Sequence, residues 1–173
     1  MRGFWLVLPF LLIRFVVLSR LNQTALHQAA RFAPLMDKER YAYVIYQISN
    51  VAVFGYLCFL EVPMDGSWMF GLGSCCYLLG LLLCFVAVVD FAKQTDNGLR
   101  KEGCYRFSRH PMYVAYFVYF MACVFLTRSW LLFGFVMLFQ ISSHWIVLSE
   151  ERWCIQMFGE AYQQYQKEVR RYL

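Results

Sequence analysis

The stretch "CYRFSRHPMYVAYF" at residues 104–117 places a cluster of positive charge at the start of an apolar segment. Arg106, Arg109 and His110 come directly before Pro111, and most of the following forty residues are apolar. Proline is favoured in the first turn of a helix, where its missing N–H costs nothing, so a helix is predicted to begin here. The free N–H groups and positive dipole end of that helix would suit an anion. The alternative is that these cations only follow the rule that basic residues collect on the cytoplasmic side of a membrane.

The chain of 173 residues has the composition of an integral membrane protein. Apolar residues make up 61% and charged residues 16%, and the mean hydropathy is +0.48, well above the values of a soluble domain. The predicted fold is therefore an all-α bundle of about five transmembrane helices, with the first and fourth short. Each apolar segment is close to the length needed to cross the hydrocarbon core; the segments are approximately 4–18, 41–62, 67–92, 112–126 and 130–148.

The basic residues predict how such a bundle is oriented. With five crossings, one end carries only Arg2 and Arg128, Arg14 lies within the first segment, and the rest of the 16 Lys and Arg residues fall at the other end. Cytoplasmic loops collect Lys and Arg, so the carboxyl terminus and the basic end are predicted to face the cytosol. The net charge of +5 then indicates orientation and attraction to anionic lipid rather than nucleic-acid binding.

The first segment has a second interpretation. The sequence "MRGFWLVLPFLLI" at residues 1–13 has the basic start and apolar run of a cleaved signal sequence,. Cleavage would leave the basic loop between residues 20 and 40 on the far side of the membrane and spoil the charge pattern, so a retained helix is favoured.

The chain is predicted to form a single membrane domain over residues 1–173. Residues 1–66 would supply N-terminal helices, and residues 67–173 a catalytic core with a cofactor pocket. Gly73 and Gly80 are seven residues apart and so share one face of the third segment, where small residues would let helices pack closely in lipid. The seven cysteines show no CxxC pair and no histidine at ligand spacing, so no metal site is predicted.

The residues "TRS" at 127–129 predict a tight hairpin between the last two apolar segments. The start of the fourth helix and the end of the fifth would then meet at the cytosolic face. This geometry brings together "RHPMY" at 109–113 and "SEER" at 149–152.

Glu150 and Glu151 are expected at the carboxyl end of the fifth helix, where the helix dipole disfavours negative charge. Gln140 and His144 continue a polar stripe from these acids into the span, and polar groups at this depth usually face a cavity or the protein interior. The alternative is an ion pair between Arg109 and one of the acids that only locks the hairpin.

The C-terminal sequence "CIQMFGEAYQQYQKEVRRYL" at 154–173 predicts an amphipathic cytosolic helix broken near Gly159. Its tyrosines form an apolar stripe, and its Lys and Arg residues would favour the head-group layer. A lid over the hairpin mouth and a simple interfacial anchor both fit this pattern.

Two motifs together resemble a known family. "GCYRFSRHPMY" at 103–113, followed by "EERWCIQMFGEAYQQYQKEVRR" at 150–171, is similar to the membrane methyltransferases that include isoprenylcysteine carboxyl methyltransferase and phospholipid methyltransferase. The resemblance covers about residues 97–171. It implies transfer of a methyl group from S-adenosylmethionine, bound on the cytosolic side, to a membrane lipid or lipidated substrate.

The resemblance also implies roles for individual residues. Arg109 and Glu150 are expected to be catalytic, and His144 to contact the substrate. By position in the motifs, the cofactor is expected to contact Asn97, Gly98, Leu99, Arg100, Tyr105, His110, Pro111, Met112, Tyr113, Glu150 and Glu151.

One departure from the family pattern leaves the acceptor open. Isoprenylcysteine enzymes resemble one another in an arginine one turn before the acids, which meets the substrate carboxylate, and this chain has Ile146 there. His144 is the nearest polar substitute. A prenylcysteine, a phospholipid amine and a small apolar thiol or carboxylate all stay possible acceptors.

Two other classes of function compete with methyl transfer. Membrane sterol reductases, which use NADPH, resemble this chain in an "RHPNY"-like motif and a tyrosine-rich tail. Met112 in place of asparagine, the pair of glutamates and the short chain favour the methyltransferases. A non-enzymatic membrane protein would not need a buried polar face beside an anion site. Neither an obligate protein partner nor a nucleic acid is predicted.

Overall fold

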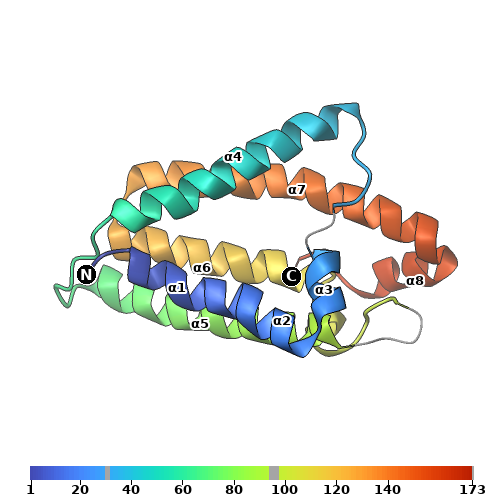
Figure 1. Ribbon diagram of the computed structural model, residues 1–173, viewed down its shortest axis with the longest axis horizontal. Coiled ribbons are helices and arrows are strands. Elements are labelled where there is room, and N and C mark those ends of the chain that lie inside the picture. Colours follow the sequence, from blue (N-terminus) through green and yellow to red (C-terminus); the bar gives the residue numbers. More distant parts are fainter. Residues whose placement is uncertain (30–31, 94–97, 173) are drawn as a thin grey trace.

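The computed structural model describes residues 1–29, 32–93 and 98–172. In this part of the chain helices are joined by loops, and one isolated bridge pairs Arg2 with Glu61 (Figure 1). The first membrane helix is continuous from α1 (Phe4–Leu11) through a π-helical segment η1 (Leu12–Val17) to α2 (Leu18–Leu21). The other long helices are α4 (Asp37–Phe59), α5 (Trp68–Ala92) and α7 (Trp130–Phe158). All four are long and apolar enough to cross a membrane.

A fifth apolar helix, α6 (Pro111–Thr127), is shorter. Its 17 residues extend about 26 Å at 1.5 Å per residue, slightly less than the hydrocarbon thickness of about 30 Å. Pro111 is its first residue, as predicted. The all-α membrane bundle is therefore confirmed, and the fourth of its five apolar helices is short as expected. The expectation that the first is also short is wrong, because it continues to Leu21 and is long enough to cross a membrane.

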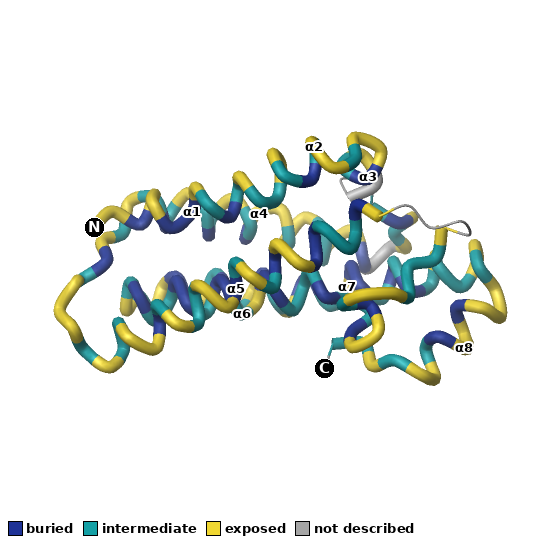
Figure 2. The backbone as a smooth tube through the Cα atoms, turned by 90° about the horizontal axis from the view of Figure 1, so that it is seen from below, coloured by how far each residue is buried: buried dark blue, intermediate teal, exposed yellow. Residues whose placement is uncertain are grey.

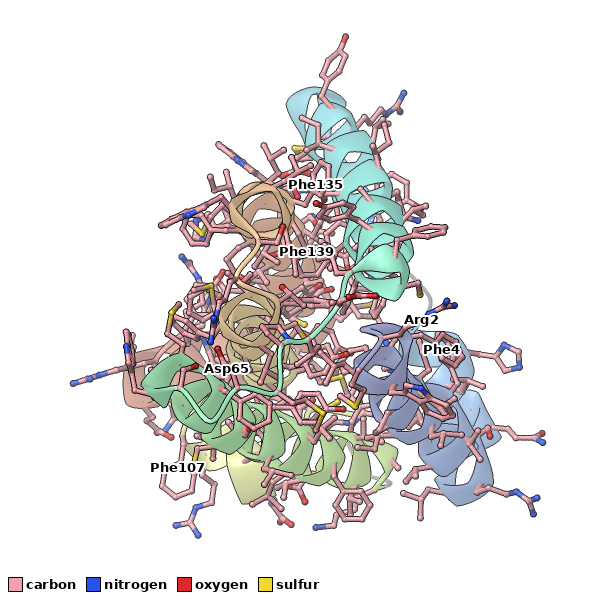
Figure 3. The ribbon with its side chains drawn as sticks, turned by 90° about the vertical axis from the view of Figure 1, so that its left-hand side faces the viewer. Arg2, Phe4, Asp65, Phe107, Phe135 and Phe139 are labelled. Carbon is pink, nitrogen blue, oxygen red and sulfur yellow. The ribbon has the colours of Figure 1, made fainter. Side chains whose placement is uncertain are left out.

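The helices pack in two close pairs, α5 along α6 and α4 along α7, while α1 contacts both α4 and α5. Figure 3 shows the bundle end-on, with Phe135 and Phe139 of α7 facing α4. There the ring of Phe139 stacks on Tyr46 with centroids 4.9 Å apart. Buried residues face the bundle axis and exposed residues face outward (Figure 2), and in a membrane these exposed apolar side chains meet lipid.

Glycine sets the close approach of α5 to α6. A Cβ atom on Gly80 would lie 2.7 Å from the Cα of Tyr119, and one on Gly73 would lie 3.0 Å from the side chain of Leu126. Both glycines therefore face α6 directly, and the predicted packing role is confirmed. Small residues allow such contacts because the backbones themselves can touch.

One end of the bundle gathers the chain start, the loop before α5 and the hairpin between α6 and α7 (Figure 3). The N-terminal amine donates to the Val62 carbonyl at 3.0 Å, and Arg128 pairs with Asp65 at 2.6 Å. Arg128 has a φ of 52° and ends α6, and the Ser129 hydroxyl then caps α7. The predicted tight hairpin at 127–129 is confirmed.

The opposite end holds α3 (Gln23–Ala29), a short 3-10 helix η2 (Gly103–Arg106) and α8 (Glu160–Glu168) (Figure 1). Gly159, with a φ of 53°, separates α7 from α8, so the predicted break in the amphipathic tail is confirmed. Most of the described Lys and Arg residues belong to segments at this end, in agreement with the charge pattern of the sequence.

The expectation that Glu150 and Glu151 end the fifth helix is wrong, because α7 continues to Phe158. No proline or glycine interrupts the chain between these acids and Gly159, so nothing local stops the helix. The dipole argument does not apply to acids placed two turns before a helix end. Their charges are instead met by cations from other segments.

Candidate functional site

The start of α6 and the acids of α7 lie side by side at the basic end of the bundle. The Tyr113 hydroxyl donates to Glu150 Oε1 at 2.9 Å, and Arg109 Nη2 lies 2.9 Å from Glu151 Oε1. These contacts join residues about forty positions apart in the sequence. The prediction that the hairpin brings the two motifs together is confirmed.

His110 lies between the two acids. Its Nδ1 is 3.5 Å from Glu150 Oε2 and its Nε2 is 3.4 Å from Glu151 Oε1, so these are ionic contacts rather than short hydrogen bonds,. Burial by itself lowers the pKa of His110, but the contacts with Glu150 and Glu151 outweigh burial and raise the pKa above its ordinary value of 6.5. The two carboxylates therefore stabilise the protonated imidazole relative to that of a free histidine.

Glu151 forms ion pairs with cationic side chains of the protein itself. Its side chain is only 5% exposed and contacts Arg109, whose side chain is 8% exposed. Arg171 also donates to it through Nε, at 3.1 Å to both oxygens, and through Nη2 at 2.8 Å. The ion pair that locks the hairpin is thus present, and Glu151 is the acid that makes it.

The contacts of Arg109 bear on its predicted catalytic role. Besides Glu151, its guanidinium donates to the Gln166 carbonyl at 3.1 Å, which ties it to α8. Arg106, the other arginine of the predicted anion site, is exposed. In the structure the anion that Arg109 holds is the chain's own carboxylate. A direct part in catalysis stays a prediction for Arg109, and its geometry favours positioning.

Glu150 is the more accessible acid, with a side chain that is 30% exposed. It accepts the hydrogen bond from the Tyr113 hydroxyl. A partly exposed carboxylate of this kind is suited to a cationic group, because its negative charge attracts cations.

The remaining predicted cofactor residues lie on the loop before α6 and on its first turn. Gly98 has a φ of 72° and lies against the ring of Phe158. Arg100 donates to the Phe91 carbonyl at 2.9 Å, and its guanidinium lies 4.1 Å from the centroid of the Phe91 ring. Tyr105 and Pro111 are buried, and Leu99 and Met112 are partly buried. Asn97 lies outside the described residues.

Sequence reasoning extended the C-terminal helix to the end of the chain, whereas α8 ends at Glu168, and it missed the contacts that the following segment makes. The backbone N–H groups of Arg109 and His110 donate to the carbonyls of Arg170 and Arg171, at 3.0 and 3.3 Å. Tyr172 then reaches His144, with its hydroxyl 2.9 Å from Nδ1. The tail therefore lies directly against the motif that opens α6. One sequence signal could have indicated this contact: Arg170 and Arg171 are adjacent, and their charge is opposite to that of the adjacent acids Glu150 and Glu151.

A second missed contact joins α4 to α7. Arg152 pairs with Glu39 through two nitrogen–oxygen distances of 2.7 Å, and it also donates to the Pro34 carbonyl. The N-terminal part of the chain thus contacts α7 one residue after the two acids.

The family model described as phospholipid methyltransferase matches residues 66–161. The chain belongs to this family. The matched stretch contains α5, α6 and α7 with both RHPMY and SEER, whereas the helices before α5, nearly all of α8 and the tail after it lie outside the match. The resemblance found in the sequence is confirmed, and the chain is an integral membrane protein of this family.

A curated relative gives a second comparison. The protein-S-isoprenylcysteine O-methyltransferase of Schizosaccharomyces pombe is 27% identical over 128 residues, which are 72% of this chain and 49% of the relative. The chain therefore spans about half the length of the curated relative it matches.

Proposed function

We propose that this protein is an S-adenosylmethionine-dependent methyltransferase that acts on a lipid-borne or apolar acceptor at the cytosolic membrane face. The observation that carries the proposal is the meeting of His110 and Tyr113 with Glu150 across the α6–α7 hairpin. This arrangement lies within the stretch that matches the methyltransferase family.

The residues at this meeting point fit the charges of the proposed cofactor. S-adenosylmethionine supplies an electrophilic methyl group on a sulfonium centre and also carries an ammonium and a carboxylate. Glu150 would meet the cationic charge and His110 the carboxylate. Tyr105 and Tyr113 would flank the cofactor, together with Gly98, Leu99, Arg100, Pro111 and Met112; the predicted contact with Asn97 stays part of the proposal.

The protein's own contribution would be to align the reactants and exclude water. Methyl transfer needs little acid or base chemistry when donor and acceptor are held in line in a dry site. Tyr162 and Tyr165 of α8 are buried, and the Tyr165 hydroxyl donates to the Tyr105 carbonyl at 2.6 Å. These contacts support a role for α8 and the tail as a cover, with Arg109 and Glu151 holding it in place.

The orientation and the division of the chain are part of the same proposal. The positive-inside rule supports a cytosolic location for the end that carries the site. Residues 67–173 would form the catalytic core, with contributions from the N-terminal helices.

For the acceptor, the relative's name points to the carboxyl group of an S-isoprenylcysteine, and the family description to a phospholipid. The first candidate acceptor is the carboxyl group of an isoprenylcysteine, as in an isoprenylcysteine carboxyl methyltransferase-like enzyme, with His144 near the substrate. A phospholipid amine is the second. Both acceptors are lipid-borne, which agrees with a site at the end of a membrane bundle.

A binding experiment tests the cofactor. Protein purified in detergent is titrated with labelled S-adenosylmethionine and, separately, with NADPH. We expect S-adenosylmethionine to bind and Glu150→Gln to weaken binding roughly 10- to 100-fold, because a charged contact contributes about 1.5–3 kcal/mol. Glu160→Gln changes an exposed acid of α8 and should bind like the wild type. Preference for NADPH, or unchanged binding by the Glu150 variant, would contradict the proposal.

A labelling experiment tests the reaction. Membranes with and without the protein are incubated with methyl-labelled S-adenosylmethionine, and the lipids are extracted. Base-labile label in a carboxyl ester would support the first candidate, and label in a phospholipid head group the second. Absence of protein-dependent label in lipid or lipidated substrate would refute a lipid-borne acceptor.

A further inference from the structure

Arg14 places a charged side chain inside the first membrane helix. Leu21, the last residue of that helix, lies seven residues further on, which is about 10 Å along the axis. Charged residues at such depth are costly and as a rule face the protein interior, where they mark functional sites. The helix is π-helical from Leu12 to Val17, and π-helical turns are often found at functional sites.

The neighbours of Arg14 along the helix show that its side chain turns into the bundle. Phe10 and Leu18, four residues before and after it, are 4% and 0% exposed. The Phe10 ring packs against Tyr116 of α6 with centroids 5.3 Å apart. Arg14 Nη1 is itself buried. The guanidinium is therefore directed toward protein rather than lipid.

Ring contacts join this part of the first helix to the Glu150 site. Tyr116 of α6, which packs against Phe10, has its ring centroid 6.3 Å from that of Tyr113. The Tyr113 hydroxyl donates to Glu150 Oε1 at 2.9 Å. Tyr116 is about one turn further along α6 than Tyr113, so these tyrosines lead from the Glu150 site into the membrane part of the bundle, where Arg14 lies.

Glu150 and Arg14 carry opposite charges at different depths of the bundle. Glu150, at the water end, suits a cation, and Arg14, deeper among the helices, suits an anion. An amphiphile that entered from the bilayer would have its polar head between the two. A guanidinium holds carboxylate or phosphate by paired, charge-assisted hydrogen bonds, and tyrosine hydroxyls can add further donors.

We propose that Arg14 binds an anionic group of the methyl acceptor, so that the acceptor is an amphiphile whose carboxylate or phosphate lies beside the Glu150 site. This inference rests on the proposed function. If a carboxylate oxygen accepts the methyl group, its lone pair forms the new O–C bond. The C–S bond breaks with its electron pair remaining on sulfur. A neutral ester and a neutral thioether result, and no proton is transferred.

Arg14 would also select against an acceptor that has only an amine. A methylated ammonium carries a positive charge, which a buried guanidinium nearby disfavours. A zwitterionic phospholipid would need its phosphate on Arg14. Carboxylate and phosphate share the chemistry that Arg14 recognises, and they can be separated by experiment.

The test measures binding of matched amphiphiles to the full-length protein in a non-ionic detergent. The probes are labelled palmitate, its uncharged methyl ester and hexadecyl phosphate. We expect the wild type to prefer one of the two anions to the ester by about tenfold or more, and Arg14→Gln to lose that preference. Arg14→Lys keeps the charge and should retain part of it. Arg20→Gln removes an exposed arginine from the same helix and should behave like the wild type.

The pattern of binding decides the outcome. Preference for palmitate would identify a carboxylate, and preference for hexadecyl phosphate a phosphate. An anion preference that Arg14→Gln keeps, or no preference in the wild type, would overturn the inference. If Arg14→Gln fails to fold, Arg14→Met provides an apolar substitute of similar length.

Binding of S-adenosylmethionine is measured on the same samples. Arg14→Gln should bind the cofactor like the wild type, because Arg14 is assigned to the acceptor alone. A wild type that binds anions through Arg14 but does not bind S-adenosylmethionine would refute the proposed function and leave the anion site standing. Failure of the Arg14 inference can therefore be distinguished from failure of the proposed methyltransferase function.

Discussion

Glu151→Gln tests whether the two adjacent acids have different tasks. The substitution keeps the size of the side chain but removes the charge that faces Arg109, His110 and Arg171. Loss of one partner from a buried ion pair costs about 3–5 kcal/mol, because the other charge is left uncompensated. Arg171 is 34% exposed and can regain water, so the lower value, about 3 kcal/mol, applies to the buried Arg109.

For a chain of this size, 1 kcal/mol corresponds to about 2–4 °C in melting temperature, so the expected fall is about 6–12 °C. The chain's own cysteines provide the assay. Cys84 and Cys123 are fully buried among the membrane helices, so a thiol-reactive dye labels them only when the bundle opens. Melting curves in detergent can then be compared between wild type and variant.

Glu150→Gln is the matched control, since it makes the same chemical change one residue away at a side chain that is 30% exposed. It should lower the melting temperature by less than about 3 °C, the effect of under 1 kcal/mol, while weakening binding of S-adenosylmethionine. The double variant Arg109→Gln with Glu151→Gln should recover part of the lost stability, because no buried charge is left alone. Equal destabilisation by the two single glutamine variants would refute the division of tasks.

Three further predictions concern packing, pH and the α4–α7 contact. Gly80→Leu should destabilise the bundle by about 1–3 kcal/mol through collision with Tyr119, whereas Gly134→Leu, in open space on α7, should not; the same thiol assay measures both. The pKa of His110 is raised in the folded state, so the stabilisation from its positive charge is fully present below pH 6.5 and is lost as pH rises through the folded-state pKa. The melting temperature should therefore fall over that pH range. His110→Gln should make the melting temperature less dependent on pH. Arg152→Gln should cost less than about 1 kcal/mol, because its pair with Glu39 is partly exposed,; a larger loss in the melting assay would contradict this.

Much of the fold could be predicted because its signals are local. Pro111 starts α6, Arg128 and Ser129 form the hairpin, and Gly159 ends α7, each as their residue types indicate. The boundary that differs most from its prediction, the extension of α7 past the acids, has a non-local cause. Glu151 is tolerated inside the helix because Arg109 and Arg171, from distant parts of the chain, pair with it, and Glu150 is tolerated because its side chain is partly exposed and contacts His110.

The candidate site was only partly accessible to sequence reasoning. The antiparallel hairpin required Tyr113 and Glu150 to lie at the same end, and the structure confirms this. The division of work between the two acids did not follow from sequence, because neighbours on a helix point about 100° apart and the rotation of α7 decides which of them meets Arg109. The arrival of Tyr172 at His144 depends on the path of the chain after Gly159, for which the sequence holds no regular pattern.

The sequence by itself determined the number and approximate lengths of the apolar helices and the concentration of basic residues at one end. These features depend on hydrophobic transfer and charge, which each segment expresses independently of its neighbours. Only the tertiary structure decided that Glu151 is held by Arg109 and Arg171 while Glu150 stays accessible, and that Arg14 of the first helix buries its guanidinium in the bundle. Side-chain partners are set by how helices rotate and cross, and these depend on the packing of the whole bundle.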